Sequence, residues 1–139
     1  MAKAQGQAAS GLIPTYVFDT GALISAERGK RRALRFLELV RIGRARVVVP
    51  LPVIAEWWRG RTDARQQILA ATRVVATVEI MKAAGHALGR VREVDARLTI
   101  DAIVMATGAL LNGVVVTEDP HDFEKLSLHF PGVHVVSGA

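Results

Sequence analysis

Short apolar runs alternate along the chain with longer stretches in which apolar residues recur every three or four positions. The runs are rich in valine, and most do not alternate between apolar and polar residues. Continuous apolar runs are typical of strands that are buried on both faces of a parallel sheet. Five strands are therefore expected, at residues 16–18, 46–50, 73–78, 114–117 and 133–136.

The stretches between these runs have helical periodicity. Helices are expected at residues 22–28, 30–42, 51–58, 63–72, 80–93, 98–112 and 122–128. The alternation of strands with helices indicates the α/β class, with a largely parallel sheet covered by helices on both faces. Leu34, Leu37 and Val40 form an apolar stripe expected to face the core, and a second inner stripe extends to Val91. The helix at 98–112 is apolar nearly all round, so it is expected to be buried under the sheet.

The 139 residues suit one domain, expected at residues 15–139. Residues 1–14 contain no apolar run long enough for a signal peptide and are expected to form a disordered tail. The absence of cysteine excludes disulfides and thiolate metal sites and agrees with a cytoplasmic location. Asn112 and Gly113 divide the apolar window 98–117 into a helix and a strand, so no membrane span is expected.

The chain has a formal net charge of +5, and 14 of its 18 basic residues are arginines. Eight basic residues lie between Arg28 and Arg46, and within that span only Glu38 opposes them. Guanidinium groups bind phosphate oxygens, so this segment is the expected nucleic-acid-binding surface. The arginines assigned to it are Arg28, Arg31, Arg32 and Arg35. The alternative is a solvated surface that only aids solubility.

Four acids lie where the local sequence gives no surface reason for a charge: Asp19, Glu56, Asp101 and Asp119. Asp101 is the only ionisable residue between 98 and 117. An ionised carboxylate in an apolar helix costs several kcal/mol unless a cation or a hydrogen-bond donor compensates it. The acids fall at or just after the carboxyl ends of strands, or on the helix that leads there, and this end of an α/β sheet is where ligands bind.

Each acid also has a purely structural explanation. Asp19 or Thr20 is a good N-cap for the helix that follows. Glu56 and Asp101 lie near helix starts, where the helix dipole favours an acid, and Asp119 lies in a plausible turn. A single shared site is a better explanation than four independent structural reasons that all happen to apply.

Carboxylates gathered at one edge repel one another unless a hard cation lies among them. Mg²⁺ and Mn²⁺ prefer oxygen ligands, and such an ion activates water and neutralises phosphodiester charge. Asp19, Asp101 and Asp119 are the expected metal ligands, and the chemistry is that of a nuclease. The chain has no P-loop, no GxSxG elbow and no zinc-like histidine spacing. Transfer through an aspartyl phosphate is a weaker alternative, since the sequence DTG at 19–21 lacks a second aspartate two residues after the first.

At this point the sequence resembles the PIN-domain ribonucleases, and among them the VapC-like toxins of bacterial toxin–antitoxin pairs. The resemblance covers about residues 15–137 and rests on four motifs in order. They are VFDTGAL at 17–23, VIAE at 53–56, DAIVMAT at 101–107 and VTEDPHDF at 116–123.

The resemblance implies a three-layer α/β/α sandwich with a five-stranded parallel sheet. It also implies a Mg²⁺- or Mn²⁺-dependent endoribonuclease whose catalytic acids are Asp19, Glu56, Asp101 and Asp119. Asp122 is a candidate additional acid, but Asp119 is preferred because a side chain two residues after Thr117 points to the same face of an extended segment. Thr20 and Thr117 are candidate polar supports. A homodimer held inactive by an antitoxin that inserts into a groove is implied as well.

Two alternatives stay open. The chain is either a toxin or another PIN-like nuclease that processes RNA, or the acids belong to a non-catalytic module that binds metal or RNA. Trp57 and Trp58, beside Glu56, are candidates for stacking on a base or contacting the antitoxin. At helical spacing, one of the two is expected to belong to the core.

Overall fold

The first strand of the sheet, β2 (Thr15–Phe18), lies at its centre. The computed structural model describes residues 12–60 and 63–139, and within them one five-stranded sheet is formed. The other strands are β3 (Arg46–Pro50), β4 (Arg73–Val75), β5 (Val114–Thr117) and β6 (Val135–Ser137). Their order is β4-β3-β2-β5-β6, and every neighbouring pair is parallel. The expected α/β class and parallel sheet are therefore confirmed.

Valines fill the middle of the sheet. Val17 of β2 is aligned with Val48 of β3 on one side and Val115 of β5 on the other. All three are buried. β-branched side chains pack well on a pleated surface that is covered on both faces, which explains why the strands read as continuous apolar runs.

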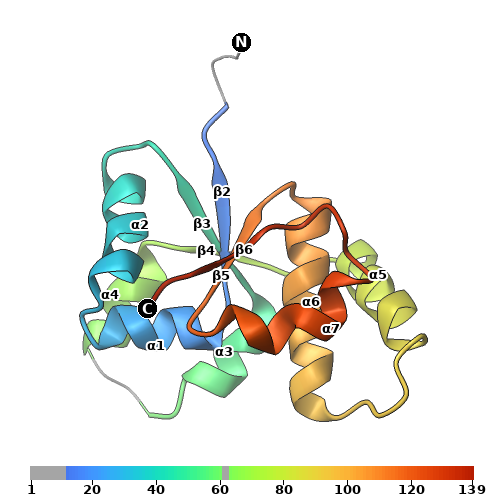
Figure 1. The fold of residues 1–139 in the computed structure, drawn as a ribbon. Helices are drawn as coiled ribbons and strands as arrows, with labels where there is room; N and C mark the ends of the chain where they lie inside the picture. Colours follow the sequence, from blue (N-terminus) through green and yellow to red (C-terminus); the bar gives the residue numbers. More distant parts are fainter. Residues whose placement is uncertain (1–11, 61–62) are drawn as a thin grey trace.

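Helices cover both faces of the sheet (Figure 1). One face carries α1 (Thr20–Glu27), α2 (Arg31–Arg41) and α4 (Asp63–Ala70). The other carries α5 (Val78–Leu88), α6 (Ala96–Leu110) and α7 (Glu124–Ser127). The short helix α3 (Leu51–Trp57) follows β3, and a 3₁₀ turn, η1 (Pro120–Phe123), follows β5. The three-layer α/β/α sandwich is confirmed, and residues 102–108 of α6 are all buried, as expected.

Capping residues correct three predicted boundaries. The predicted helix 80–93 ends at Leu88, so Val91 lies outside it, because Gly89 follows and the next amides bond back in tight turns. Helix α6 begins two residues earlier than predicted because the Asp95 side chain accepts a hydrogen bond from the Leu98 amide at 2.8 Å. Strand β4 ends at Val75 rather than residue 78, since Thr77 caps α5 through the Ile80 amide.

The last strand is shifted by two residues at its start and one at its end relative to the prediction of 133–136. Val135 aligns with Val115 of β5, and the Ser137 backbone aligns with Thr117. The Val133 amide instead donates to the Phe130 carbonyl and closes the preceding turn. The turn, which periodicity does not reveal, sets where the strand can begin.

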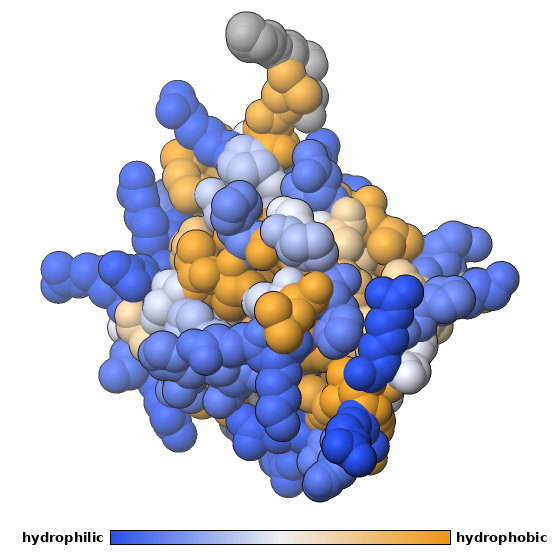
Figure 2. Space-filling model, turned by 45° about the vertical axis from the view of Figure 1, so that its right-hand side comes forward, coloured by the Kyte–Doolittle hydropathy of each residue, from blue (hydrophilic) through white to orange (hydrophobic). Residues whose placement is uncertain are grey.

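Several apolar side chains stay exposed on the face that carries α5, α6 and α7. Figure 2 shows hydrophobic and strongly hydrophilic side chains next to one another when this side is brought forward. Leu128 is 81% exposed and Val78 is 64% exposed. No helix in residues 12–60 and 63–139 is long and apolar enough to cross a membrane.

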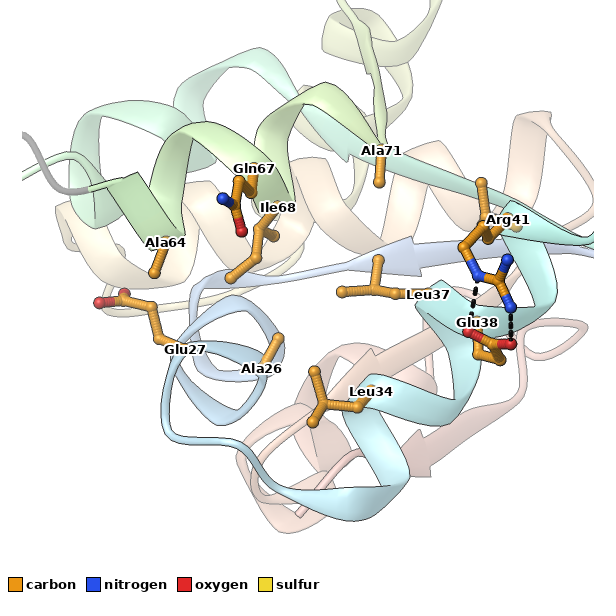
Figure 3. Close-up of a pocket in the computed structure, with 11 residues that line it drawn as sticks. Ala26, Glu27, Leu34, Leu37, Glu38, Arg41, Ala64, Gln67, Ile68 and Ala71 are labelled. Carbon is orange, nitrogen blue, oxygen red and sulfur yellow. Dashed lines mark hydrogen bonds and ion pairs between the residues drawn. The ribbon is translucent and has the colours of Figure 1, made fainter.

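Helix α2 packs less closely than its apolar stripe predicts. Leu34, expected to face the core, is 42% exposed, and the small neighbour Ala33 is buried instead. Leu34, Leu37 and Val40 line a groove of about 720 Å³ between α1, α2 and α4 (Figure 3). The expectation of a buried Leu34 is wrong because these three helices leave an apolar gap between them.

The expected tail, residues 1–14, lies mostly outside the described residues. Its last residue, Pro14, accepts a hydrogen bond from the Arg46 amide at 2.9 Å through its carbonyl oxygen. This bond prolongs the pairing between the segment before β2 and strand β3.

Candidate active site

The predicted acids meet at the carboxyl edge of the sheet, beside β2. The chain leaves β2 through α1 and returns as β3 on one side, while β5 pairs on the other side. Such a switch point leaves a crevice between the strand ends. A cavity of about 270 Å³ lies here. Its lining includes every acid and threonine singled out from the sequence: Asp19, Thr20, Glu56, Asp101, Thr117, Asp119 and Asp122.

Asp19 both caps a helix and faces the cavity. Its Oδ1 accepts a hydrogen bond from the Ala22 amide at 2.8 Å, and its side chain is buried. Burial raises the pKa of Asp19 to about 6; hydrogen bonds from Thr117 and Ala22 oppose the rise, and the nearby Glu56 charge adds to it. Asp19 therefore does cap α1, and its carboxylate faces the cavity at the same time.

Glu56 reaches the cavity from α3 and is held there by α1. The Thr20 hydroxyl donates a hydrogen bond to Glu56 Oε1 at 2.6 Å. Helix α3 starts directly after β3, with Pro50 as its N-cap residue and Pro52 in its first turn. This abrupt start puts Glu56 in the second turn of α3, where it contacts Thr20, the first residue of α1.

Asp101 lies in the second turn of α6, beyond the reach of the helix dipole at its N-terminus. Burial raises the pKa of Asp101 to about 7, and the charge of Asp19 is the next largest cause. The Arg97 guanidinium opposes this rise. Asp19 and Asp101 therefore lie close enough for their charges to interact.

Arg97 is a cavity residue that the sequence analysis missed. It lies four residues before Asp101 on α6, and its Nη2 is 3.2 Å from Asp122 Oδ2. Residues four apart lie on the same face of a helix, so this spacing was the available signal. Arg97 offsets only part of the cost of burying Asp101, because the pKa of Asp101 stays raised and the ion pair of Arg97 is with Asp122.

The two acids of the last motif have different surroundings. Asp119 Oδ1 caps η1 by accepting from the His121 amide at 3.0 Å. Asp122 pairs with Arg97, and its charge raises the pKa of both Asp19 and Asp101. Both line the cavity, but the electrostatic coupling links Asp122 to the buried acids.

Gly21 lets α1 approach the loop after β5. A Cβ added at Gly21 would lie 2.9 Å from Glu118 Cβ and 3.1 Å from the Glu118 backbone nitrogen. Contacts this short force backbone to move. The glycine after Asp19 and Thr20 is therefore needed for the two sides of the cavity to come together.

The arginines assigned to RNA binding lie outside this cavity. Arg31, Arg32 and Arg35 are exposed on α2, and Arg28 pairs with Glu118 at 3.8 Å on the surface. Of the two tryptophans, Trp57 is 2% exposed and belongs to the core, as expected for one of the pair. Trp58 is half-buried against its edge.

Carboxylate oxygens are the ligands that Mg²⁺ and Mn²⁺ prefer. Within residues 12–60 and 63–139, no group of three or more histidine, aspartate or glutamate side chains is arranged to hold a metal ion. Mg²⁺ is commonly held by one or two carboxylates together with water and substrate phosphates. The donor chemistry of the cavity fits such a partly hydrated ion rather than a cage made only of protein.

Comparison with known proteins places this geometry in a family. The model of the PIN domain matches residues 16–127. Among curated proteins, none matches the chain significantly in sequence.

The fold is shared with solved structures of other proteins, among them the following three. The VapBC2 complex of Rickettsia felis bound to promoter DNA has a TM-score of 0.63 and 15% identity, and the match covers 88% of this chain and 98% of that one. A toxin–antitoxin complex from Klebsiella pneumoniae has a TM-score of 0.65 and 22% identity, covering 89% and 98%. DNA-bound VapBC from Salmonella typhimurium has a TM-score of 0.62 and 14% identity, covering 91% and 100%. At these identities the similarity establishes the fold. Together with the match over residues 16–127, it shows that the chain belongs to the PIN domain family.

Proposed function

We propose that this protein is a Mg²⁺- or Mn²⁺-dependent endoribonuclease that hydrolyses RNA phosphodiester bonds. The observation that carries the proposal is the convergence of carboxylates from four separate segments on one cavity of about 270 Å³. Two of them, Asp19 and Asp101, have pKa values raised by burial and by the charges of neighbouring acids: Glu56 and Asp122 act on both, and Asp19 also acts on Asp101. Acids that repel in this way favour a bound cation.

Asp19 and Asp101, with Asp119 or Asp122, are the residues that would hold the ion. When bound, the ion lowers the pKa of a coordinated water and neutralises charge on the phosphodiester. Glu56, whose Oε1 accepts a hydrogen bond from the Thr20 hydroxyl, would act as the general base toward a water in the cavity. Arg97 offers a guanidinium at the cavity wall for a phosphate oxygen.

The substrate class follows from charge and from the PIN-domain resemblance. A net charge of +5, supplied mainly by arginine, suits a polyanionic substrate. RNA rather than DNA is proposed from the resemblance to PIN-domain ribonucleases. The cysteine-free sequence agrees with action in the reducing cytoplasm.

Cleavage of a generic RNA in the presence of Mg²⁺, Mn²⁺ or EDTA tests the proposal. Asp101→Asn should lower the rate by several orders of magnitude because one ligand of the ion is lost. Asp95→Asn is a matched control, since Asp95 caps the same helix, does not line the cavity, and asparagine caps as well as aspartate. Cleavage that is insensitive to EDTA, or retained in Asp101→Asn, would reject the metal-dependent nuclease.

We further propose that the protein is the toxin of a toxin–antitoxin pair and that its antitoxin binds the apolar groove. The structurally similar complexes from Rickettsia felis and Klebsiella pneumoniae support this assignment. The groove between α1, α2 and α4 has a volume of about 720 Å³ (Figure 3). Figure 3 shows Leu34 and Leu37 of α2 facing Ile68 of α4 across it. An exposed leucine in an apolar groove suits the apolar face of a partner helix.

Expression in bacteria separates the toxin from a PIN-like enzyme that processes RNA. A toxin should arrest growth, and co-expression of the product of the neighbouring open reading frame should restore it. Leu34→Glu should keep the arrest and abolish the rescue, because it places a charge in the groove away from the acidic cavity. Growth unaffected by the wild type would instead favour an RNA-processing role. Light scattering of the purified protein tests the proposed homodimer.

A further inference from the structure

A second, basic pocket lies on the face that carries α5, α6 and α7. It has a volume of about 390 Å³ and is formed by residues 90–93, after α5, and by the end of α7 with the residues that follow. Arg90, Arg92, Lys125, Leu128 and His129 are among its lining residues. Figure 2 brings this side of the molecule forward and shows hydrophilic side chains next to exposed hydrophobic ones.

We propose that this pocket binds the phosphates and one base of the single-stranded RNA that occupies the acidic cavity. This inference rests on the proposed nuclease function. It identifies the surface that the RNA contacts outside the acidic cavity. In this proposal the main RNA-contacting surface is formed by residues 90–93, between α5 and α6, and by α7. Helix α2, expected from the sequence, is not that surface.

The first argument is that the cations of this pocket have no acidic partners. In the part of the chain that the structure describes, Arg90, Arg92 and Lys125 form no ion pair with an acid. Only one acid, Glu93, lines the pocket. Cations that converge on a concave surface without partners attract anions and bind phosphate oxygens well.

The second argument is continuity with the acidic cavity. The turn η1 and helix α7 border both sites: Asp122 lines the acidic cavity, and Lys125, three residues later, lines the basic pocket. On the other side, the segment 90–93 leads within a few residues to Arg97, which lines the acidic cavity. The Arg97–Asp122 ion pair at 3.2 Å joins the two segments that lead from the acidic cavity to the basic pocket. A strand bound at the acids reaches the basic pocket by passing this pair.

The third argument identifies a polynucleotide rather than a small anion. Leu128 is 81% exposed, and it lines the same pocket as His129. An exposed leucine next to an imidazole offers an apolar contact for a base, whereas a free phosphate would gain nothing from it. A ligand that places phosphates on the three cations and a base on Leu128 has the chemistry of single-stranded RNA.

The surface expected from the sequence also has arginines without acidic partners in the described residues, but these arginines do not line a pocket that leads toward the acids. Arg31, Arg32 and Arg35 are exposed on α2, and none of them lines the acidic cavity or the basic pocket. The concave surface to which α2 contributes is the apolar groove. These three arginines therefore provide a matched control with the same number of charges.

The test measures binding of a fluorescent single-stranded oligoribonucleotide in EDTA, which prevents metal-dependent cleavage, at several salt concentrations. One variant combines Arg90→Gln, Arg92→Gln and Lys125→Gln; the other combines Arg31→Gln, Arg32→Gln and Arg35→Gln. Each phosphate contact contributes roughly 0.7 to the slope of log affinity against log salt for single strands. The first variant should lose roughly 2 from that slope, and the second should retain the wild-type slope. Equal slopes for the two variants would overturn the proposal.

A second variant tests the base contact. Leu128→Ser removes no charge, so it should weaken binding several-fold without changing the salt slope. Because Leu128 is exposed, this change should leave the melting temperature close to that of the wild type. Unchanged affinity would reject the polynucleotide and leave only an anion site. If the wild type cleaves RNA but the two triple variants have equal salt slopes, only this inference is refuted. If the wild type does not cleave RNA, the proposed function is refuted.

Discussion

The indole Nε1 of Trp57 donates a hydrogen bond to Glu27 Oε1, with 2.7 Å between the two atoms. The other oxygen of Glu27 lies 3.1 Å from Arg65 Nε, so the carboxylate joins α1, α3 and α4. At the opposite end of α1, Thr20 donates to Glu56, the residue before Trp57. Helix α3 is therefore tied to both ends of α1, and the position of Glu56 depends on a bond that lies away from the cavity.

Trp57→Phe should lower the free energy of unfolding by at least about 1.5–3 kcal/mol, because a hydrogen bond to a carboxylate is lost and the smaller ring leaves part of the buried space empty. RNA cleavage should fall as well, since Glu56 is held less firmly. Trp58→Phe is the control, because it changes a half-buried neighbour whose indole has no hydrogen bond in the described residues. Urea denaturation and cleavage rates give both readouts. Equal effects of the two substitutions would contradict the role given to the Trp57–Glu27 bond.

The metal-free protein should become more stable as the pH falls from about 8 to about 5. The pKa values of Asp19 and Asp101 are raised to about 6 and about 7, above their ordinary value of 3.8. Between pH 3.8 and about 7 the folded state therefore binds more protons than the unfolded state. The stability of the folded state declines as the pH rises through this range. Melting temperatures in EDTA across this range measure the effect. Asp101→Asn should flatten the curve and melt higher than the wild type at pH 8, whereas Asp95→Asn should follow the wild type; a flat wild-type curve would show that the acids do not repel.

Asp122→Asn should reduce metal-induced stabilisation more than Asp119→Asn. The charge of Asp122 acts on both Asp19 and Asp101, while Asp119 caps η1. For the wild type, about 10 mM Mg²⁺ or Mn²⁺ at a site with a Kd of about 1 mM gives roughly 1.4 kcal/mol of stabilisation. Thermal melts of the three proteins with and without metal measure the difference. A larger loss in Asp119→Asn would support the assignment of Asp119 that the strand geometry at Thr117 favours.

Gly21→Ala should destabilise the protein by about 1–3 kcal/mol and lower its activity, because the new Cβ would meet Glu118 at 2.9 Å. The matched control is Gly85→Ala in the middle of α5, where an added Cβ meets nothing within 4 Å. That change should stabilise the protein by about 0.5–1 kcal/mol, since alanine is the better helix former. Denaturation curves compare the two variants. A neutral Gly21→Ala would mean that α1 and the loop after β5 can separate without cost.

The sequence by itself determined the fold class, the number of strands and the approximate place of the site. Continuous valine runs identify strands buried on both faces, and parallel strands bring their carboxyl ends to one edge. An acid that follows such a run, as Asp19 does, is therefore near every other acid that does the same. Asp101 was recognisable for a different reason, since a single charge in an apolar helix requires a compensating neighbour.

Tertiary structure alone decided which residues complete or leave that site. Arg97 and Asp122 come from segments 25 residues apart, and their contact depends on how α6 packs beside η1. Leu34 has the periodicity of a core residue, yet the gap between α1, α2 and α4 leaves it exposed. The arginines of α2 make the densest charge in the sequence, but none of Arg31, Arg32 and Arg35 lines the acidic cavity, which instead contains Arg97 of α6. Hydrophobic periodicity identifies the apolar side of a helix or strand. The packing of distant elements determines which residues that side contacts.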